Sequence, residues 1–266
     1  MKQARLILVG CGPHARRVYL PALAKLRAES GLELLLVIDL EAMRETVNAA
    51  LAQHGLESQV LFIEPFEGGV PEQLKRTLSE FTRSKQVNGV IIATEPLTHR
   101  AYAEWALREK LNILMDKPVT ARINSASQME SADGILLDYL HLLEIYQSVQ
   151  AMQETVFIVN SQRRFHAGFC FVERLLREIG DKTGCPVTFM QSYHSDGQWR
   201  FPSEIVTQDY HPYCFGYGKA SHSGYHIFDM LYRLYSATGV ASKQADSMEI
   251  VSSFVQPAGF IQQLTE

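Results

Sequence analysis

The chain has 266 residues, of which 46% are hydrophobic and 20% charged, as in an ordinary globular protein. Its formal net charge of -4 excludes the basic footprint of a nucleic-acid-binding protein. No apolar run is long enough to span a membrane, and an apolar strand pattern starts too early for a signal peptide. The four cysteines follow neither disulfide nor zinc-finger spacing. We therefore expect a cytoplasmic protein whose partner is a small molecule.

Short apolar runs alternate with amphipathic stretches along the first 160 residues. Runs with the composition of buried strands occupy 5–9, 32–38, 60–63, 90–93, 113–115 and 155–161. Helical patterns occupy 15–28, 41–53, 71–81, 99–109 and 125–153. Continuous apolar strands that alternate with helices indicate a parallel sheet covered on both faces. The sequence therefore predicts an α/β fold built on a doubly wound sheet.

The pattern changes after about residue 182, which predicts a second domain. Strand character at 186–192 and 248–255 flanks an aromatic, glycine-rich segment and a helix at 223–236. We expect residues 1–122 to form a dinucleotide-binding Rossmann domain, to which a sixth strand and its crossover helix return at about 155–180. Residues 123–266 would form a substrate and oligomerisation domain of the α+β class with an open sheet.

A glycine-rich turn follows the first predicted strand. Residues 10–15 read Gly-Cys-Gly-Pro-His-Ala, the G-x-G-x-x-A form of the dinucleotide fingerprint. Gly10 permits the tight turn, Gly12 lets the backbone approach a pyrophosphate, and Ala15 lets the helix pack close to the strand. Pro13 and His14 open that helix, whose N-terminus offers unpaired N–H groups to phosphates. The alternative is a plain strand–turn–helix.

The second predicted strand ends in an acid, Asp39. An acid at this place can accept hydrogen bonds from the ribose hydroxyls of adenosine. Because it would repel a 2′-phosphate, the sequence favours NAD over NADP. Arg44 lies near enough in sequence to leave NADP open, and a solvated aspartate is the alternative interpretation.

Lys117 follows the fifth predicted strand, within Asp116-Lys117-Pro118. Ligands of open α/β sheets bind beyond the carboxyl ends of the strands, so Lys117 is expected to point into the binding crevice. A lysine there can hold a substrate hydroxyl and assist its proton transfer. The alternative is an ordinary exit turn.

His222, His226 and Asp229 have spacings of four and three residues. On a helix these spacings place the three side chains on one face. The same spacing suits zinc, and a pair of buried core histidines is a further alternative. Since no other ligand-type residues cluster with them, we expect no metal.

Together these motifs resemble the Gfo/Idh/MocA oxidoreductases, named for glucose-fructose oxidoreductase and inositol dehydrogenase. The family's Glu-Lys-Pro element is similar to residues 116–118, its Thr-Pro-Asn-x-x-His stretch to 94–99, and its Arg-Tyr/Phe element to 162–165. Its Asp-x-Gly-x-His-x-x-Asp pattern is similar to residues 222–229, with His222 in place of the first acid. The resemblance extends from the N-terminus to about residue 235.

The resemblance implies NAD, or else NADP, as cofactor and a homodimer or larger oligomer. It implies hydride transfer between nicotinamide and a carbinol or carbonyl carbon of a sugar-like or cyclic polyol substrate. It implies that Lys117 and His226 form a proton-handling pair, which His222 assists. It places Thr94, His99 and Lys117 beside the cofactor. Arg164 and Asp229 are weaker candidates for substrate contact.

Two other functions stay open. Replacement of the acid by His222 favours a catalytically idle NAD-binding sensor or partner protein, and some relatives use NAD transiently to cleave glycosides. Family members continue well past residue 266, so either the chain is truncated or its second domain is abbreviated. An incomplete sheet would expose an edge that favours pairing with another chain.

Overall fold

The computed structural model describes residues 3–194, 215–218, 220–239, 245 and 247–253. The chain divides into two compact units, which we describe separately. The first unit comprises Met1–Arg164 and Ser192–Met230, and the second comprises Phe165–Gln191 and Leu231–Glu266. The domain boundary expected at residue 122 stays a prediction.

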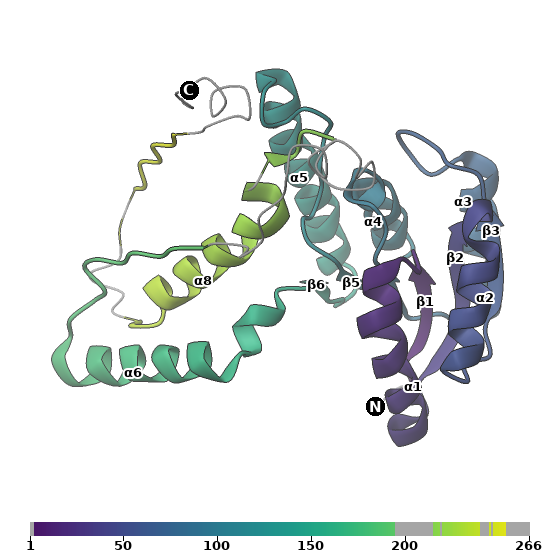
Figure 1. The fold of residues 1–266 in the computed structure, drawn as a ribbon, viewed down its shortest axis with the longest axis horizontal. Helices are drawn as coiled ribbons and strands as arrows, with labels where there is room; N and C mark the ends of the chain where they lie inside the picture. Colours follow the sequence, from purple (N-terminus) through teal and green to yellow (C-terminus); the bar gives the residue numbers. More distant parts are fainter. Residues whose placement is uncertain (1–2, 195–214, 219, 240–244, 246, 254–266) are drawn as a thin grey trace, which may run out of the picture. The chain divides into compact units, whose positions relative to one another are not determined.

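The first unit contains one parallel sheet (Figure 1). Its strands are β1 (Arg5–Val9), β2 (Glu33–Leu40), β3 (Gln59–Ile63), β4 (Gly89–Ile92), β5 (Asn112–Met115) and β6 (Phe157–Val159). The strand order is β3-β2-β1-β4-β5-β6, the order of doubly wound dinucleotide-binding sheets. The predicted α/β fold class is thereby confirmed.

Helices connect these strands, close to where the hydrophobic pattern predicts them. They are η1 (Ala15–Tyr19), α1 (Leu20–Ser30), η2 (Glu41–Met43), α2 (Arg44–Gln53), α3 (Glu72–Ser84), η3 (Pro96–Thr98), α4 (His99–Arg108) and α5 (Met129–Gln150). After β6 come η4 (Gln162–Phe165), η5 (Ala220–Gly224) and α8 (Tyr225–Ser236). The segment η1 is a π-helical turn directly behind the glycine loop, and such turns are frequent at functional sites.

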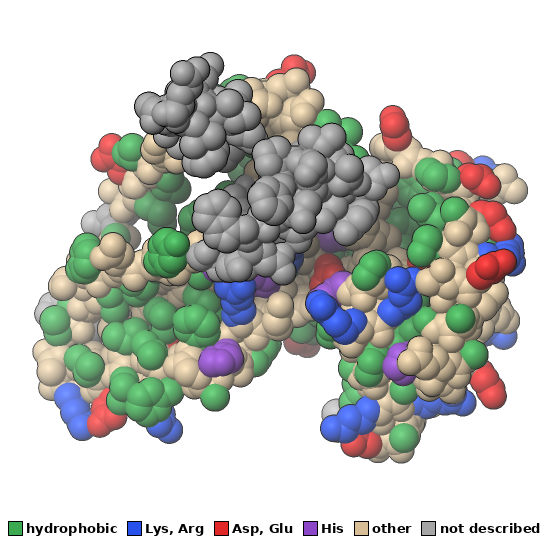
Figure 2. All heavy atoms as spheres, viewed as in Figure 1, with side chains coloured by type: hydrophobic (Ala, Val, Ile, Leu, Met, Phe, Trp, Pro, Cys, Tyr) green, Lys and Arg blue, Asp and Glu red, His purple; other side chains and the backbone are tan. Residues whose placement is uncertain are grey.

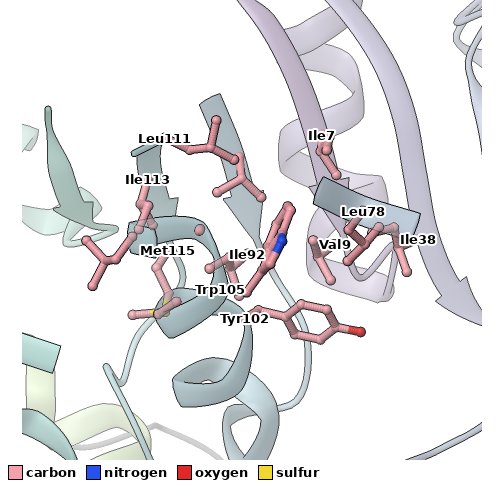
Figure 3. Packing of buried hydrophobic residues seen from close by; sticks show 14 of the residues in the cluster. Ile7, Val9, Ile38, Leu78, Ile92, Tyr102, Trp105, Leu111, Ile113 and Met115 are labelled. Atoms are coloured by element: carbon pink, nitrogen blue, oxygen red, sulfur yellow. The ribbon is translucent and has the colours of Figure 1, made fainter. Parts of the chain in front are cut away.

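Both faces of the sheet are buried, because successive side chains of each strand point to opposite faces. One face packs against α3, α4 and α5, with Trp105 of α4 at its centre (Figure 3). Its strand residues include Ile7, Val9, Ile38, Ile92, Ile113 and Met115. The other face packs against η1, α1 and α2 through residues such as Leu8, Val37 and Ile91. Burial on both faces explains the continuous apolar runs.

The strand order places the candidate site. β2 and β4 flank β1, so the connections after β1 and β4 leave toward opposite sides of the sheet. In open α/β sheets the ligand binds at such a point, outside the carboxyl ends of the strands. Asp39 lies next to the last residue of β2, and the glycine loop, Lys117 and residues 94–99 start one or two residues after the ends of β1, β5 and β4.

The second unit contains α6 (Ala167–Thr183) and the last residues of α8. Its described part forms no strand, so the strand prediction was wrong for 186–192 and 248–253; residues 254 and 255 lie outside the described residues. A strand is stable only when its backbone groups pair with a neighbour, and the described residues of this unit pair none. Apolar side chains along α6, such as Phe171 and Ile179, are exposed. Hydrophobic side chains are visible on the surface of this part of the chain in Figure 2.

None of the helices in the described part of the chain is both long enough and apolar enough to cross a membrane.

Candidate active site

The glycine loop has the geometry that the fingerprint requires. Gly10 has a φ of 84°, and a Cβ there would lie 2.7 Å from both the Ala93 oxygen and the Thr94 nitrogen. Gly12, in contrast, has no atom within 4 Å of the position of a Cβ. Ala15 is fully buried beneath the first helical turn. The loop is therefore tight at Gly10 and open at Gly12, where a pyrophosphate would approach.

A cavity of about 220 Å³ lies at the carboxyl ends of β1, β2 and β4. Its lining includes Gly10, Gly12, Asp39, Thr94 and Tyr102. A larger hollow of about 700 Å³ opens at the amino ends of β1, β2 and β3, which is the wrong edge for a ligand of such a sheet. The smaller cavity is thus the one that the topology assigns to a nucleotide.

Asp39 combines a structural contact with spare accepting capacity. Its carboxylate accepts hydrogen bonds from the backbone N–H groups of Cys11 and Leu40, each at 2.7 Å. An ionised carboxylate offers about four lone-pair positions, so about two are left for ribose hydroxyls. The acid thereby fixes the glycine loop and faces the cavity at the same time.

Arg44 is paired with Glu41 and is therefore not available to bind a 2′-phosphate of NADP. Its guanidinium donates to both carboxylate oxygens of Glu41, at 2.6 and 2.7 Å, and lies 4.2 Å from the ring centroid of Phe62. Through this pair Arg44 lowers the pKa of Glu41, and Glu41 raises the pKa of Arg44. The two acids Asp39 and Glu41 therefore both oppose NADP.

We expect Asp39→Ser combined with Glu41→Ala to move the preference toward NADP, because the first change removes repulsion and the second frees Arg44. The ratio of the two dissociation constants should shift about tenfold or more, which corresponds to ~1.4 kcal/mol. Titration of the protein with each dinucleotide measures the ratio, and Glu45→Ala, an exposed acid of α2, is the control. An unchanged ratio in the double variant would contradict this role.

His99 joins the exits of β4 and β5. Its ring is fully buried, with Nδ1 at 2.7 Å from the Pro118 oxygen and Nε2 at 3.0 Å from the Thr94 oxygen. Burial lowers its pKa, which favours the neutral ring. Thr94 lines the cavity, whereas both His99 nitrogens face backbone carbonyls. The predicted cofactor role of His99 thus stays a prediction. His99 would influence a bound cofactor only indirectly, by holding the backbone of Thr94 and Pro118 in place.

Asp116 lies in a hydrogen-bonded cluster that the sequence did not reveal. Tyr19 of η1 donates to Asp116 Oδ1 at 2.7 Å, and Asn160 donates to the Tyr19 hydroxyl at 2.8 Å. His14 Nε2 lies 3.7 Å from the same carboxylate. Burial, with the charge of Asp116, raises the pKa of Tyr19 far above its usual value, so the phenol stays a donor. The cluster holds the residue next to Lys117 in place.

The charge of Lys117 acts on His226. Burial lowers the pKa of Lys117, opposed by Asp116 and reinforced by Arg163. Burial also lowers the pKa of His226 to about 4, and the charges of Arg163 and Lys117 add to this effect. The Lys117–Pro118 peptide is cis. Of the two residues that the resemblance pairs, Lys117 is therefore close enough for its charge to lower the pKa of His226.

Two contacts tie the start of α8 to the exit of β6. Ser161 Oγ lies 3.4 Å from the Tyr225 hydroxyl, and Arg164 binds the Asp229 carboxylate with two donors, one of them at 2.7 Å. Arg164 and Asp229 are thus brought together as a pair. The side chain of His222 lies outside the described residues, so its predicted role stays a prediction. The described residues contain no cluster of metal-ligating side chains.

We expect Asp116→Asn to shift the pH dependence of turnover downward. The carboxylate stabilises the ammonium form of Lys117, so its loss lets that ammonium release its proton at lower pH. The limb of the kcat/KM profile that reports Lys117 should move to lower pH, while the amide still accepts from Tyr19. A limb that stays in place, or moves upward, would show that Asp116 does not act on Lys117.

Comparison with known proteins agrees with this geometry. Residues 4–132 match the family described as "Oxidoreductase family, NAD-binding Rossmann fold" (GFO_IDH_MocA). These residues belong to the Gfo/Idh/MocA oxidoreductases. The match confirms the family resemblance and the NAD-binding class of the Gfo/Idh/MocA domain, and no curated protein matches the chain.

Solved structures support the fold of this chain. A putative myo-inositol dehydrogenase from Sinorhizobium meliloti has 16% identity and a TM-score of 0.55, over 88% of this chain and 56% of that one. The WlbA dehydrogenase from Thermus thermophilus, in complex with NAD and UDP-GlcNAcA, has 19% identity and a TM-score of 0.57, over 87% and 63%. The chain thus spans less than two thirds of the length of these structures.

Proposed function

We propose that this protein is an NAD-dependent oxidoreductase that exchanges hydride with a carbinol or carbonyl carbon of a sugar-like or cyclic polyol substrate. The observation that carries the proposal is the position of Lys117 just after β5, at the carboxyl edge of a dinucleotide-binding sheet, close enough to His226 for its charge to lower the pKa of that histidine. Membership of residues 4–132 in an oxidoreductase family supports it. The dehydrogenase neighbours share the fold at low identity.

The residues present fit a dinucleotide. Gly12 leaves open space for a diphosphate, the start of the first helix offers N–H groups, and Asp39 retains accepting positions for ribose hydroxyls. Thr94 would lie beside the bound molecule, because it lines the same cavity. When bound, nicotinamide supplies the hydride-accepting or hydride-donating carbon.

In alcohol oxidation, Lys117 and His226 would hold the substrate hydroxyl and take its proton as the hydride leaves the carbon. The lowered pKa of Lys117 increases the fraction of amine able to act as a base near neutral pH. His226, with a pKa of about 4, is neutral there and can accept a hydrogen bond from the substrate hydroxyl. In the reverse direction the same groups return the proton to the carbonyl oxygen.

The test measures NAD binding and NADH formation with a panel of cyclic polyols, aldoses and glycosides. The proposal expects micromolar-range NAD binding and NADH formation with at least one polyol or sugar. NAD binding without turnover of any compound would overturn it in favour of a sensor. Glycoside cleavage without net NADH would overturn it in favour of the transient use of NAD.

A further inference from the structure

The chain segments that carry Lys117 and Arg163 leave the sheet side by side. β5 and β6 pair in parallel, with Met115 opposite Val159, and the Asn160 nitrogen donates to the Met115 oxygen at 2.7 Å. Both strands therefore end at the same level. Lys117 follows two residues after β5, and Arg163 lies in η4 just after β6.

The start of α8 is fixed over this exit. Its anchors are the contact of Tyr225 with Ser161 and the two-donor pair of Asp229 with Arg164. His226 lies between these two anchors in the sequence, so they place it on the same exit. Hydrogen bonds and strand pairing thus bring Lys117, Arg163 and His226 together.

The two neighbouring arginines differ in their partners. Arg164 is neutralised by Asp229, whereas the described residues provide no hydrogen bond or ion pair for the half-buried Arg163 side chain. The charge of Arg163 instead disfavours protonation of both Lys117 and His226, lowering the pKa of each. Asp116, the acid next to Lys117, already accepts from Tyr19 and Asn160. The exit thus carries three basic side chains, those of Lys117, Arg163 and Arg164, against the two carboxylates of Asp116 and Asp229.

His226 adds an independent sign of a missing ligand. The side chain is buried, with 6% exposure, and its Nδ1 is enclosed without a hydrogen-bond partner among the described residues. Buried polar atoms in native proteins are almost always hydrogen-bonded. An orphan ring nitrogen beside a cation cluster indicates that a polar group of a ligand completes the site.

We propose that this exit binds an anionic group of the substrate and that Arg163 is the residue that recognises it. The inference rests on the proposed function, because it places the anion beside the carbon that would exchange hydride. The planar guanidinium suits the two oxygens of a carboxylate or phosphate. The positive charge of oxidised nicotinamide would further favour an anion. The substrate class is accordingly narrowed to sugar acids or sugar phosphates rather than neutral polyols.

Calorimetric titration of the protein saturated with NADH tests this inference with three matched probes. D-glucose, D-glucuronate and D-glucose 6-phosphate differ only at carbon 6, so the two anionic probes distinguish carboxylate from phosphate. We expect at least one anion to bind about tenfold or more tightly than glucose. Arg163→Gln should remove this preference and Arg163→Lys should keep part of it, while Arg76→Gln, at an exposed site of α3, should leave it unchanged.

Each outcome decides the inference separately from the proposed function. Equal affinities, including no measurable binding of either anion, would overturn it, as would an anion preference that survives in Arg163→Gln. A preference that depends on Arg163 supports the anion site even where no NADH forms. NADH formation from neutral polyols without any anion preference supports hydride transfer and removes this inference.

Discussion

Lys117→Ala should lower kcat by roughly 10³-fold, the range expected for loss of a group that transfers a proton. The dissociation constant for NAD should change little, since the glycine loop and Asp39 are separate from Lys117. Lys117→Arg should be nearly as inactive, because a guanidinium keeps its proton at every accessible pH. Steady-state kinetics with the best substrate of the panel, together with NAD titration, measures both effects.

Lys25→Ala serves as the control, because Lys25 is an exposed residue of α1 in a surface pair with Glu29. It should retain the activity of the unmodified protein. Full activity of Lys117→Ala would remove this residue from the proton transfer. Loss of NAD binding in the same variant would show that it acts on the cofactor instead.

Gly10→Ala should mainly lower the stability of the fold, whereas Gly12→Ala should mainly weaken NAD binding. The methyl group at residue 10 would meet the backbone of Ala93 and Thr94 at 2.7 Å, at a φ of 84° that disfavours side chains. We expect this variant to lose about 3 kcal/mol of unfolding free energy from strain and overpacking. Denaturant unfolding of the two variants measures the difference.

Gly12→Ala should change the free energy of unfolding by less than about 1 kcal/mol, because no atom lies within 4 Å of the added methyl group. Its dissociation constant for NAD should nevertheless rise about tenfold or more, since the methyl group occupies the space of the diphosphate. Unchanged NAD affinity in a folded Gly12→Ala protein would mean that the diphosphate does not approach here.

The sheet was predictable because its strands are buried on both faces. Successive residues of β1, such as Ile7 and Leu8, enter opposite cores, so the run is apolar throughout and short enough to read as a strand. The strand predictions in the second unit had no such support. Apolar composition alone marked residues 186–192, and the described structure offers them no pairing partner.

The site was predictable where a residue lies at the carboxyl end of a strand or within two residues after it. That rule selected Asp39 and Lys117, and it would also have selected Asn160 after β6. Tyr19 could not be found this way, because it lies within a helix and its partner Asp116 is 97 residues away. Tyr217, whose hydroxyl binds Glu95 beside the cavity, is 122 residues from its partner and was missed for the same reason.

Arg163 and Arg164 show a further limit of sequence reasoning. They are adjacent and identical in type, so the sequence alone could not say which one contacts a ligand. The structure separates them, because Asp229 takes Arg164 and leaves Arg163 beside Lys117. Which arginine is able to contact a ligand therefore depends on its ion-pair partner, and that partner lies in a distant segment of the sequence.

A crystal structure of the protein with NAD and a bound substrate analogue would locate the cofactor and the reacting oxygen together. We expect a dinucleotide that extends from Gly12 past Thr94, with the reacting oxygen of the analogue within hydrogen-bond distance of both Lys117 and His226. Nucleotide density at another edge of the sheet, or an analogue oxygen out of reach of these two side chains, would contradict the assignment as an oxidoreductase site.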